Sequence, residues 1–142
     1  MKKFLYLSRA AALSTAIGLI FSTSVLALPP TLNNNGIDYI TGGIGLDEST
    51  EIEAAQRQWP LTLQFAAANR TGGEFVANVN VSISDSRGRE VMTAVADGPY
   101  LLVKLPPGRY NVSATYNGVM MKKSVTIQRG KPVKASMLWR AS

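Results

Sequence analysis

The chain has 142 residues, enough for one domain, and it contains neither histidine nor cysteine. This composition excludes Ser-His-Asp and Cys-His catalytic arrangements, zinc sites built on these residues, and any disulfide framework. A general base would have to be a carboxylate, a lysine or a tyrosine, which disfavours most enzyme classes. We therefore predict no catalytic residues, no metal site and no cofactor.

Residues 1–27 have the pattern of an export signal. The segment begins with the basic residues Lys2, Lys3 and Arg9. Residues 10–21 are mostly apolar, and Val25-Leu26-Ala27 fits the small-residue rule for a signal cleavage site. We predict cleavage after Ala27. The alternative is an uncleaved membrane anchor, for which the apolar stretch is short and interrupted.

The predicted mature chain begins at Leu28, and removal of the three cations lowers the net charge from +6 to +3. No cysteine follows the cleavage site, so we expect a soluble protein, not a lipoprotein, without stable membrane insertion. An exported domain that lacks cysteine is more typical of a bacterium than of a small secreted animal protein. The predicted location is the periplasm, where nucleic acid is a poor partner.

Residues 28–45 are predicted to form an extended leader rich in glycine and asparagine. Ile37–Ile40 could form a short strand within it. The leader either binds a partner or is a disordered terminus. The glycines at residues 42–45 precede a helix, but they lack the lysine and hydroxyl residue of a phosphate-binding loop, so a tight bend is the simpler interpretation.

Residues 46–59 are predicted to form one helix that packs on the sandwich. Three residues are candidates to cap its start: Asp47, Ser49 and Thr50. Residues at spacings of three and four give it one apolar face that should dock on a sheet: Ile52, Ala55 and Trp59. Because Pro60 disfavours helical geometry at the residue before it, the helix should end near Gln58.

Residues 60–142 are predicted to form the β-sandwich domain. Apolar and polar residues alternate in four segments, as expected for half-buried strands: residues 61–65, 79–84, 110–116 and 133–140. Three further segments are expected to be strands: residues 89–95, 100–105 and 119–128. Turn signals such as Asn117-Gly118 recur about every ten residues. The predicted fold is mainly β, an antiparallel prealbumin-like or Ig-like sandwich of about seven strands with one short N-terminal α-helix.

The run from Tyr100 to Gly118, which contains Leu105-Pro106-Pro107-Gly108-Arg109-Tyr110, resembles the carboxypeptidase regulatory-like domain. Residues 79–88, with the turn Asp85-Ser86-Arg87-Gly88, look like the first hairpin of this family, and residues 42–48 look like the leader of its small stand-alone periplasmic members. The resemblance implies a prealbumin-like (transthyretin-like) sandwich that acts in docking or recognition without catalysis. Transthyretin-like hydrolases depend on histidine, which this chain lacks.

Three side-chain groups could carry chemistry, and each has a simpler structural interpretation. The acidic cluster could hold calcium or supply paired carboxylates, but it suits the start of a helix: Asp47, Glu48, Glu51 and Glu53. The basic cluster could attract anionic headgroups or polyanions, but it also protects exposed strands: Lys122, Lys123, Arg129, Lys131 and Lys134. The aromatic residues could stack on sugars, but they are expected in the core: Trp59, Trp139, Tyr100, Tyr110 and Tyr116.

The predicted function is that of an exported, non-catalytic module that binds or docks to an unidentified envelope protein. Strand addition at a sheet edge is one expected mode. Two loops are the other candidate binding surfaces: Asp97, Gly98 and Pro99, and Pro106, Pro107 and Gly108. The alternative is a carbohydrate-binding module with a glycan as partner, which would need exposed aromatic residues on one face. A hydrolase is the third and least favoured hypothesis.

Overall fold

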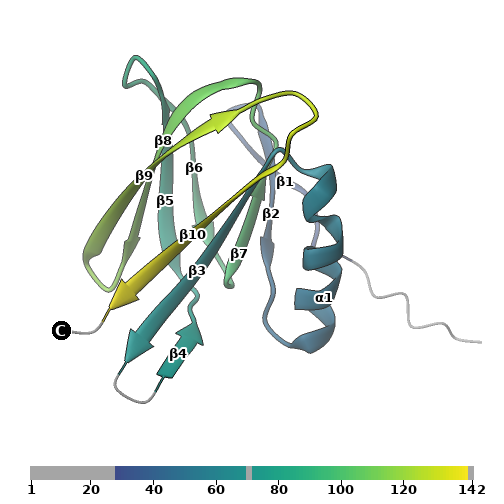
Figure 1. Cartoon of the computed structure of the whole chain (residues 1–142), viewed down its shortest axis with the longest axis vertical. Helices are drawn as coiled ribbons and strands as arrows, with labels where there is room; N and C mark the ends of the chain where they lie inside the picture. Colours follow the sequence, from purple (N-terminus) through teal and green to yellow (C-terminus); the bar gives the residue numbers. More distant parts are fainter. Residues whose placement is uncertain (1–27, 70–71, 141–142) are drawn as a thin grey trace, which may run out of the picture.

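The computed structural model describes residues 28–69 and 72–140, so the predicted export signal and its cleavage site lie outside the described residues (Figure 1). Within these ranges the chain forms ten strands, one α-helix and one 3₁₀ turn. Their bounds are β1 Leu32–Asn34, β2 Ile37–Gly42, α1 Leu46–Ala55, η1 Gln56–Gln58, β3 Leu61–Asn69, β4 Gly72–Phe75, β5 Val79–Asp85, β6 Glu90–Ala96, β7 Tyr100–Val103, β8 Gly108–Tyr116, β9 Val119–Ile127 and β10 Val133–Arg140.

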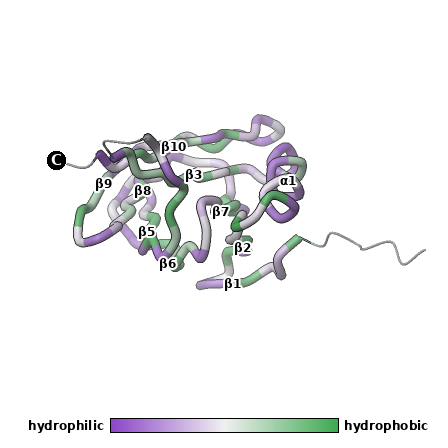
Figure 2. Tube along the Cα trace, turned by 90° about the horizontal axis from the view of Figure 1, so that it is seen from below, coloured by the Kyte–Doolittle hydropathy of each residue, from purple (hydrophilic) through white to green (hydrophobic). Residues whose placement is uncertain are grey.

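The strands form two open sheets. The first sheet has the order β1-β2-β7-β3-β10, with β4 added at the far end of β3, and the second has the order β6-β5-β8-β9. All pairings are antiparallel except one, in which β3 and β10 run parallel with Leu61 beside Val133. Figure 2 views the molecule from below, with β3 and β10 along one side and β5 and β6 along the other.

One core fills the space between the sheets. Alternate residues of β3 and β5 are fully buried there, among them Leu63, Phe65 and Val81. The period of two puts their neighbours, such as Asn80, on the outer surface. Within the described residues, no buried side-chain nitrogen or oxygen lacks a hydrogen-bond partner. The predicted alternation is therefore confirmed in β5, whereas in β3 the polar residue Thr62 is also buried, at 1% exposure.

Helix α1 covers the outer face of the first sheet. Its predicted apolar face is confirmed, because Ile52 and Ala55 are buried in a second, smaller cluster with Ile40 and Leu102, and Trp59 packs against that cluster. This cover explains why all four residues of β7 are buried, although a strand with one solvated face would alternate.

The predicted capping of α1 is wrong. The helix begins after Gly45 without a side-chain cap, so all three predicted caps, Asp47, Ser49 and Thr50, lie within the helix. There the hydroxyls of Ser49 and Thr50 donate to the carbonyl of Leu46, at 3.0 and 2.7 Å. The carboxylate of Glu48 instead accepts a hydrogen bond from the Gly43 N–H at 2.7 Å, which links the helix to the preceding bend.

The bend before α1 needs glycine because it passes over an aromatic ring. A Cβ atom on Gly43 would lie 2.5 Å from Cδ2 of Tyr100, and the φ angle of Gly43 is 102°. Both Gly42 and Gly43 are buried at this point. The glycine-rich stretch therefore brings the chain tightly across the sheet and into the helix.

Side chains of the leader bridge the two sheets along one side. The Thr93 N–H of β6 donates to Oδ1 of Asn34 at 2.9 Å, and Nδ2 of Asn35 donates to the Val91 carbonyl at 2.9 Å. We call these two contacts the asparagine seam. Because they use backbone groups on the outer edge of β6, a partner strand could pair with this stretch only after displacing them.

The opposite side is bridged by longer side chains. Strands β9 and β10 follow one another in the chain but belong to different sheets. Nζ of Lys123 donates to the Ser136 carbonyl at 3.0 Å, and Nε1 of Trp139 donates to the Val119 carbonyl at 2.9 Å. Together with the asparagine seam, these contacts join the two open sheets on both sides.

The expectation of about seven antiparallel strands is wrong in number and in one pairing. The described residues contain ten strands, and β3 and β10 are parallel. The additional strands include β1 and β4, which are mostly exposed and have few apolar residues, so they give no alternating pattern. The predicted strand at Ile37–Ile40 is confirmed within β2.

Candidate functional site

A cleft of about 510 Å³ lies at the end of the molecule where the helix stops. Three segments line it: residues 57–60 after α1, residues 104–107 between β7 and β8, and residues 127–132 between β9 and β10. They are distant in sequence, and we call the space between them the basic cleft. Its size is within the range of about 300–1,000 Å³ that is usual for ligand-binding sites.

The first wall is set by the end of the helix. Trp59 has extended backbone angles and its N–H donates to the Gln56 carbonyl at 3.2 Å, which closes the 3₁₀ turn. Pro60 follows and prevents the helix from continuing, so the predicted helix end near Gln58 is confirmed. Trp59 is half-buried: it packs against the core beneath α1 and also borders the cleft.

The second wall is the Pro106-Pro107 turn. The hydroxyl of Tyr110 donates to the Pro106 carbonyl at 2.8 Å, which holds the turn on the end of β8. Tyr110 is only 8% exposed, and burial, followed by the negative charge of Asp85, raises the pKa of its hydroxyl. The tyrosine therefore remains a neutral hydrogen-bond donor at neutral pH.

The third wall is the turn between β9 and β10. The Lys131 N–H donates to the Gln128 carbonyl at 3.2 Å, and the Val133 N–H donates to the Pro60 carbonyl at 2.9 Å. The second bond joins this turn to the residue that follows the helix. The walls are thus held by hydrogen bonds within the chain, two of them by backbone bonds and the proline turn by the Tyr110 hydroxyl.

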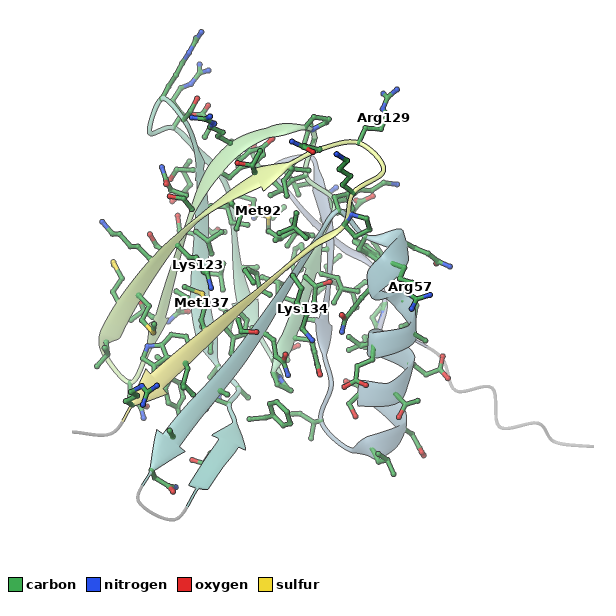
Figure 3. The ribbon with its side chains drawn as sticks, in the orientation of Figure 1. Arg57, Met92, Lys123, Arg129, Lys134 and Met137 are labelled. Carbon is green, nitrogen blue, oxygen red and sulfur yellow. The ribbon has the colours of Figure 1, made fainter. Side chains whose placement is uncertain are left out.

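The charge of the cleft has one sign. Four cationic residues line it and no acidic residue does: Arg57, Lys104, Arg129 and Lys131. Among residues 28–69 and 72–140, the one ion pair joins Arg89 to Asp85 at 3.3 Å, in a different turn. Figure 3 shows Arg57 beside the helix and Arg129 above it, at the tip of the turn between β9 and β10, on the same side of the view. These cations therefore add up to a local positive potential.

The two predicted binding loops have different environments. Pro106 and Pro107 are exposed and line the basic cleft, and Gly108 is exposed directly after them. In the other loop only Asp97 is exposed, because Gly98 and Pro99 are buried. The structure therefore does not bring the two loops into one surface.

The Asp97–Pro99 loop is a packed junction. The Asp97 N–H donates to Oγ1 of Thr41 at 2.9 Å, and the Pro99 carbonyl accepts from the Phe65 N–H at 2.8 Å. A Cβ atom on Gly98 would lie 2.5 Å from the Gly42 carbonyl oxygen. These contacts connect β6 and β7 to the glycine-rich bend, and they leave little surface for a partner.

The basic cluster of the sequence is divided by the fold. Arg129 and Lys131 line the cleft, whereas Lys123 bridges β9 and β10, and Nζ of Lys134 lies 6.0 Å from the centre of the Tyr100 ring. Sequence reasoning missed Arg57 and Lys104 as members of the site. Each is an isolated cation in its own segment, and only the folded chain places it beside the Arg129 turn.

Two members of the acidic cluster, Glu48 and Glu53, support the fold. Glu48 accepts from the glycine bend, and Oε1 of Glu53 accepts a hydrogen bond of 2.8 Å from the Tyr100 hydroxyl. In the described part of the chain, no group of three or more Asp or Glu side chains is arranged to hold a metal ion. Both carboxylates therefore have a role in attaching α1 to the sheet.

The predicted core aromatics are largely confirmed. Tyr100, Tyr110 and Trp139 are at most 8% exposed, and Tyr116 is half-buried with its ring centre 5.7 Å from that of Trp139. Only Trp59 combines partial exposure with a place in the basic cleft. The described aromatic residues therefore supply one candidate side chain for contact with a ligand in this cleft.

A second groove lies at the opposite end, between Tyr116 and Val119 on one side and Leu138 and Trp139 on the other. Its lining contains both an acidic and a basic side chain, Glu74 and Arg140, and Asn69. It has no charge of a single sign, unlike the basic cleft. We therefore take the basic cleft as the candidate site.

Comparison with models of known protein families and with curated proteins gave no match to this chain. No helix within residues 28–69 and 72–140 has the length and apolar character needed to cross a membrane. The conclusion about the site therefore depends on its own geometry: a preformed cleft with apolar and cationic residues in its lining and no acidic one.

Proposed function

We propose that the chain is an exported, non-catalytic module of the carboxypeptidase regulatory-like type, which binds another protein of the cell envelope through the basic cleft. The observation that carries the proposal is the meeting of four cations, without an acidic residue, around Trp59 and the Pro106-Pro107 turn. Arginine and tryptophan are enriched among the residues that dominate binding energy at protein interfaces.

The lack of histidine and cysteine supports a binding role over catalysis. The candidate bases with a perturbed pKa, Tyr100 and Tyr110, lie in structural hydrogen bonds that attach the helix and the proline turn. A base held in this way is not free to take a proton from a substrate. Location in the periplasm is part of the proposal and rests on the predicted export signal of residues 1–27.

Binding in the cleft is favoured over strand addition at β6 and along the side formed by β9 and β10. At β6 the asparagine seam occupies Thr93 and Val91, and on the other side Lys123 and Trp139 occupy carbonyls of β10 and β9. A partner strand would first have to displace these bonds. The basic cleft, in contrast, is open and its backbone is already ordered by its own contacts.

A carbohydrate-binding module is the second candidate, because Trp59 is a half-buried aromatic residue at the cleft. The variant Trp59→Ala separates the two functions. Loss of binding to a glycan array with a small change in stability would favour the carbohydrate function. Unchanged glycan binding would leave the protein-docking function as the better explanation.

Site-specific photocrosslinking in the native host tests the docking function. A photoreactive amino acid replaces Gln128, which is exposed in the cleft, and in the control it replaces Asn80, which is exposed on the outer face of the second sheet. The full precursor carries a tag after Ser142, and crosslinked partners are identified by mass spectrometry. We expect one reproducible partner from position 128 and not from position 80.

The same experiment can contradict the proposal. Crosslinks from position 80 alone would move the docking surface to the outer face of the second sheet. No crosslinked protein from either position, with the protein recovered from the periplasm, would argue against protein docking and leave a glycan as the leading partner.

A further inference from the structure

We infer that the basic cleft binds an extended, acidic segment of its protein partner, in which carboxylates alternate with apolar residues. This inference rests on the proposed function and adds the chemistry of the partner. It follows from three features of the cleft: the placement of its cations, the character of its floor, and its concave shape.

The cations surround the floor from all three walls. Arg57 follows the helix, Lys104 precedes the proline turn, and Arg129 and Lys131 lie in the turn between β9 and β10. All four are exposed, and none forms an ion pair with a described residue. Carboxylates that enter the cleft would therefore meet cations that have no internal competitor.

The floor is apolar. Leu105 and Ile127 are buried beneath it, and the side chains of Trp59, Pro106 and Pro132 border it. Grooves lined by aromatic residues bind extended chains, and in a fully extended chain successive side chains point to opposite sides. An apolar residue on the floor would then place the neighbouring acidic residues near the rim.

The concave shape favours a peptide over a membrane. The apolar residues form the floor, while the cations occupy the exposed rim. A flat anionic bilayer could reach the rim cations, but it could not fill the space above Trp59. A polypeptide segment can satisfy both parts of the cleft at the same time.

Fluorescence anisotropy with a dye-labelled peptide tests the inference. The probe is a short peptide of alternating Glu and Pro, and the matched control peptide has Gln in place of every Glu. We expect binding of the Glu–Pro peptide alone, and loss of that binding near 1 M salt, where the Debye length falls to about 3 Å. The mature protein, from Leu28 to Ser142, is used throughout.

Paired charge variants show whether the cleft is the binding site. The double variant Arg129→Gln/Lys131→Gln should weaken peptide binding about tenfold, equivalent to about 1.4 kcal/mol. The control Arg87→Gln/Lys122→Gln removes the same charge from exposed positions outside the cleft and should leave the affinity unchanged. These four side chains are exposed and donate no hydrogen bond to a described residue, so both variants should fold.

Several results would overturn the inference: equal binding of both peptides, equal weakening by both double variants, or no binding of the Glu–Pro peptide at about 1 mM. Binding of phosphatidylglycerol vesicles in place of the peptide would assign the cleft to lipid. A crosslinked partner at position 128 without peptide binding would leave docking intact and reject only the acidic segment. Failure of both experiments would reject both proposals.

Discussion

The hydroxyl of Tyr100 donates a hydrogen bond of 2.8 Å to Oε1 of Glu53, across the interface between the first sheet and α1. The Tyr100 hydroxyl oxygen also accepts a hydrogen bond from Nε2 of Gln64 at 3.3 Å, and Tyr100 is only 2% exposed. Burial, followed by the hydrogen bond and charge of Glu53, raises the pKa of Tyr100 to about 12 from 10.0. The contact that attaches the helix thus depends on a protonated tyrosine.

Tyr100→Phe should lower the free energy of unfolding by about 1.5–3 kcal/mol near neutral pH, because the hydrogen bond to the charged Glu53 and the bond from Gln64 are both lost. The folded-state pKa of Tyr100 lies above its unfolded value of 10.0, so its contribution is full below pH 10 and is lost as the pH rises toward about 12. The difference between wild type and variant should narrow over this window. Urea unfolding at a series of pH values measures it.

Tyr39→Phe is the matched control, since Tyr39 lies in the same sheet and its hydroxyl has no hydrogen-bond partner among the described residues. This control should not reproduce the loss near neutral pH. Parallel pH curves for wild type and Tyr100→Phe would show that the hydroxyl does not contribute in the way described.

Gly98→Ala should destabilise the fold by about 1–3 kcal/mol, because the added methyl group would overlap backbone atoms. The nearest is the Gly42 carbonyl oxygen at 2.5 Å, in the bend that leads into α1. Gly73→Ala is the control, since its nearest neighbour would be the Ala67 carbonyl oxygen at 3.8 Å. Thermal unfolding compares the two, and equal melting temperatures would mean that the Gly98 loop can move aside.

The same loop illustrates what the sequence could predict. The turn residues Asp97-Gly98-Pro99 predict a connection between two strands, and the structure confirms it between β6 and β7. Its burial depends on the glycine bend at Gly42, which is distant in the chain. A turn signal describes the local backbone only, so it does not say which turns remain exposed and which are covered by another segment.

The chain contains two Asn-Gly pairs, Asn35-Gly36 and Asn117-Gly118. Asn117-Gly118 predicts the turn between β8 and β9, and its φ angles of 49° and 77° agree with that prediction. Asn35-Gly36 has nearly the same angles, 52° and 83°, and forms the turn between β1 and β2. The residues before it do not indicate a hairpin, because β1 has little apolar character and its contact with the second sheet is a side-chain bond to β6.

The cleft was predictable only in part. The Pro106-Pro107 turn was identified from its own residues, since proline fixes the local backbone. Arg57 lies there because α1 packs on the first sheet, and Lys104 because it follows β7, a strand of that sheet. The β9–β10 turn lies there because β10 pairs in parallel with β3. Such pairing brings together segments far apart in the sequence, and no local pattern predicts it.

The two tryptophans should respond differently to truncation. Trp139→Ala should lower the free energy of unfolding by about 3–5 kcal/mol, because Trp139 packs in the core, where its ring centre lies 6.0 Å from that of Phe65. Trp59→Ala should cost about 1 kcal/mol, because part of its ring faces the cleft. Urea unfolding monitored by circular dichroism gives both values. A larger loss at Trp59 would mean that its main role is to hold α1, and it would weaken the case for a contact residue.

Asn34→Ala tests whether the asparagine seam protects the edge of β6. The Thr93 N–H donates to Oδ1 of Asn34, so its amide hydrogen should exchange faster with solvent in the variant, by an amount equivalent to the loss of about 1 kcal/mol of protection.

An exposed edge also pairs more readily with other chains, so the variant should associate more strongly at high concentration. The control Asn80→Ala, on the outer face of β5, should change neither the exchange of Thr93 nor the association. Unchanged exchange in Asn34→Ala would mean that backbone packing, and not this side chain, protects the edge, and strand addition at β6 would again become a plausible mode of binding.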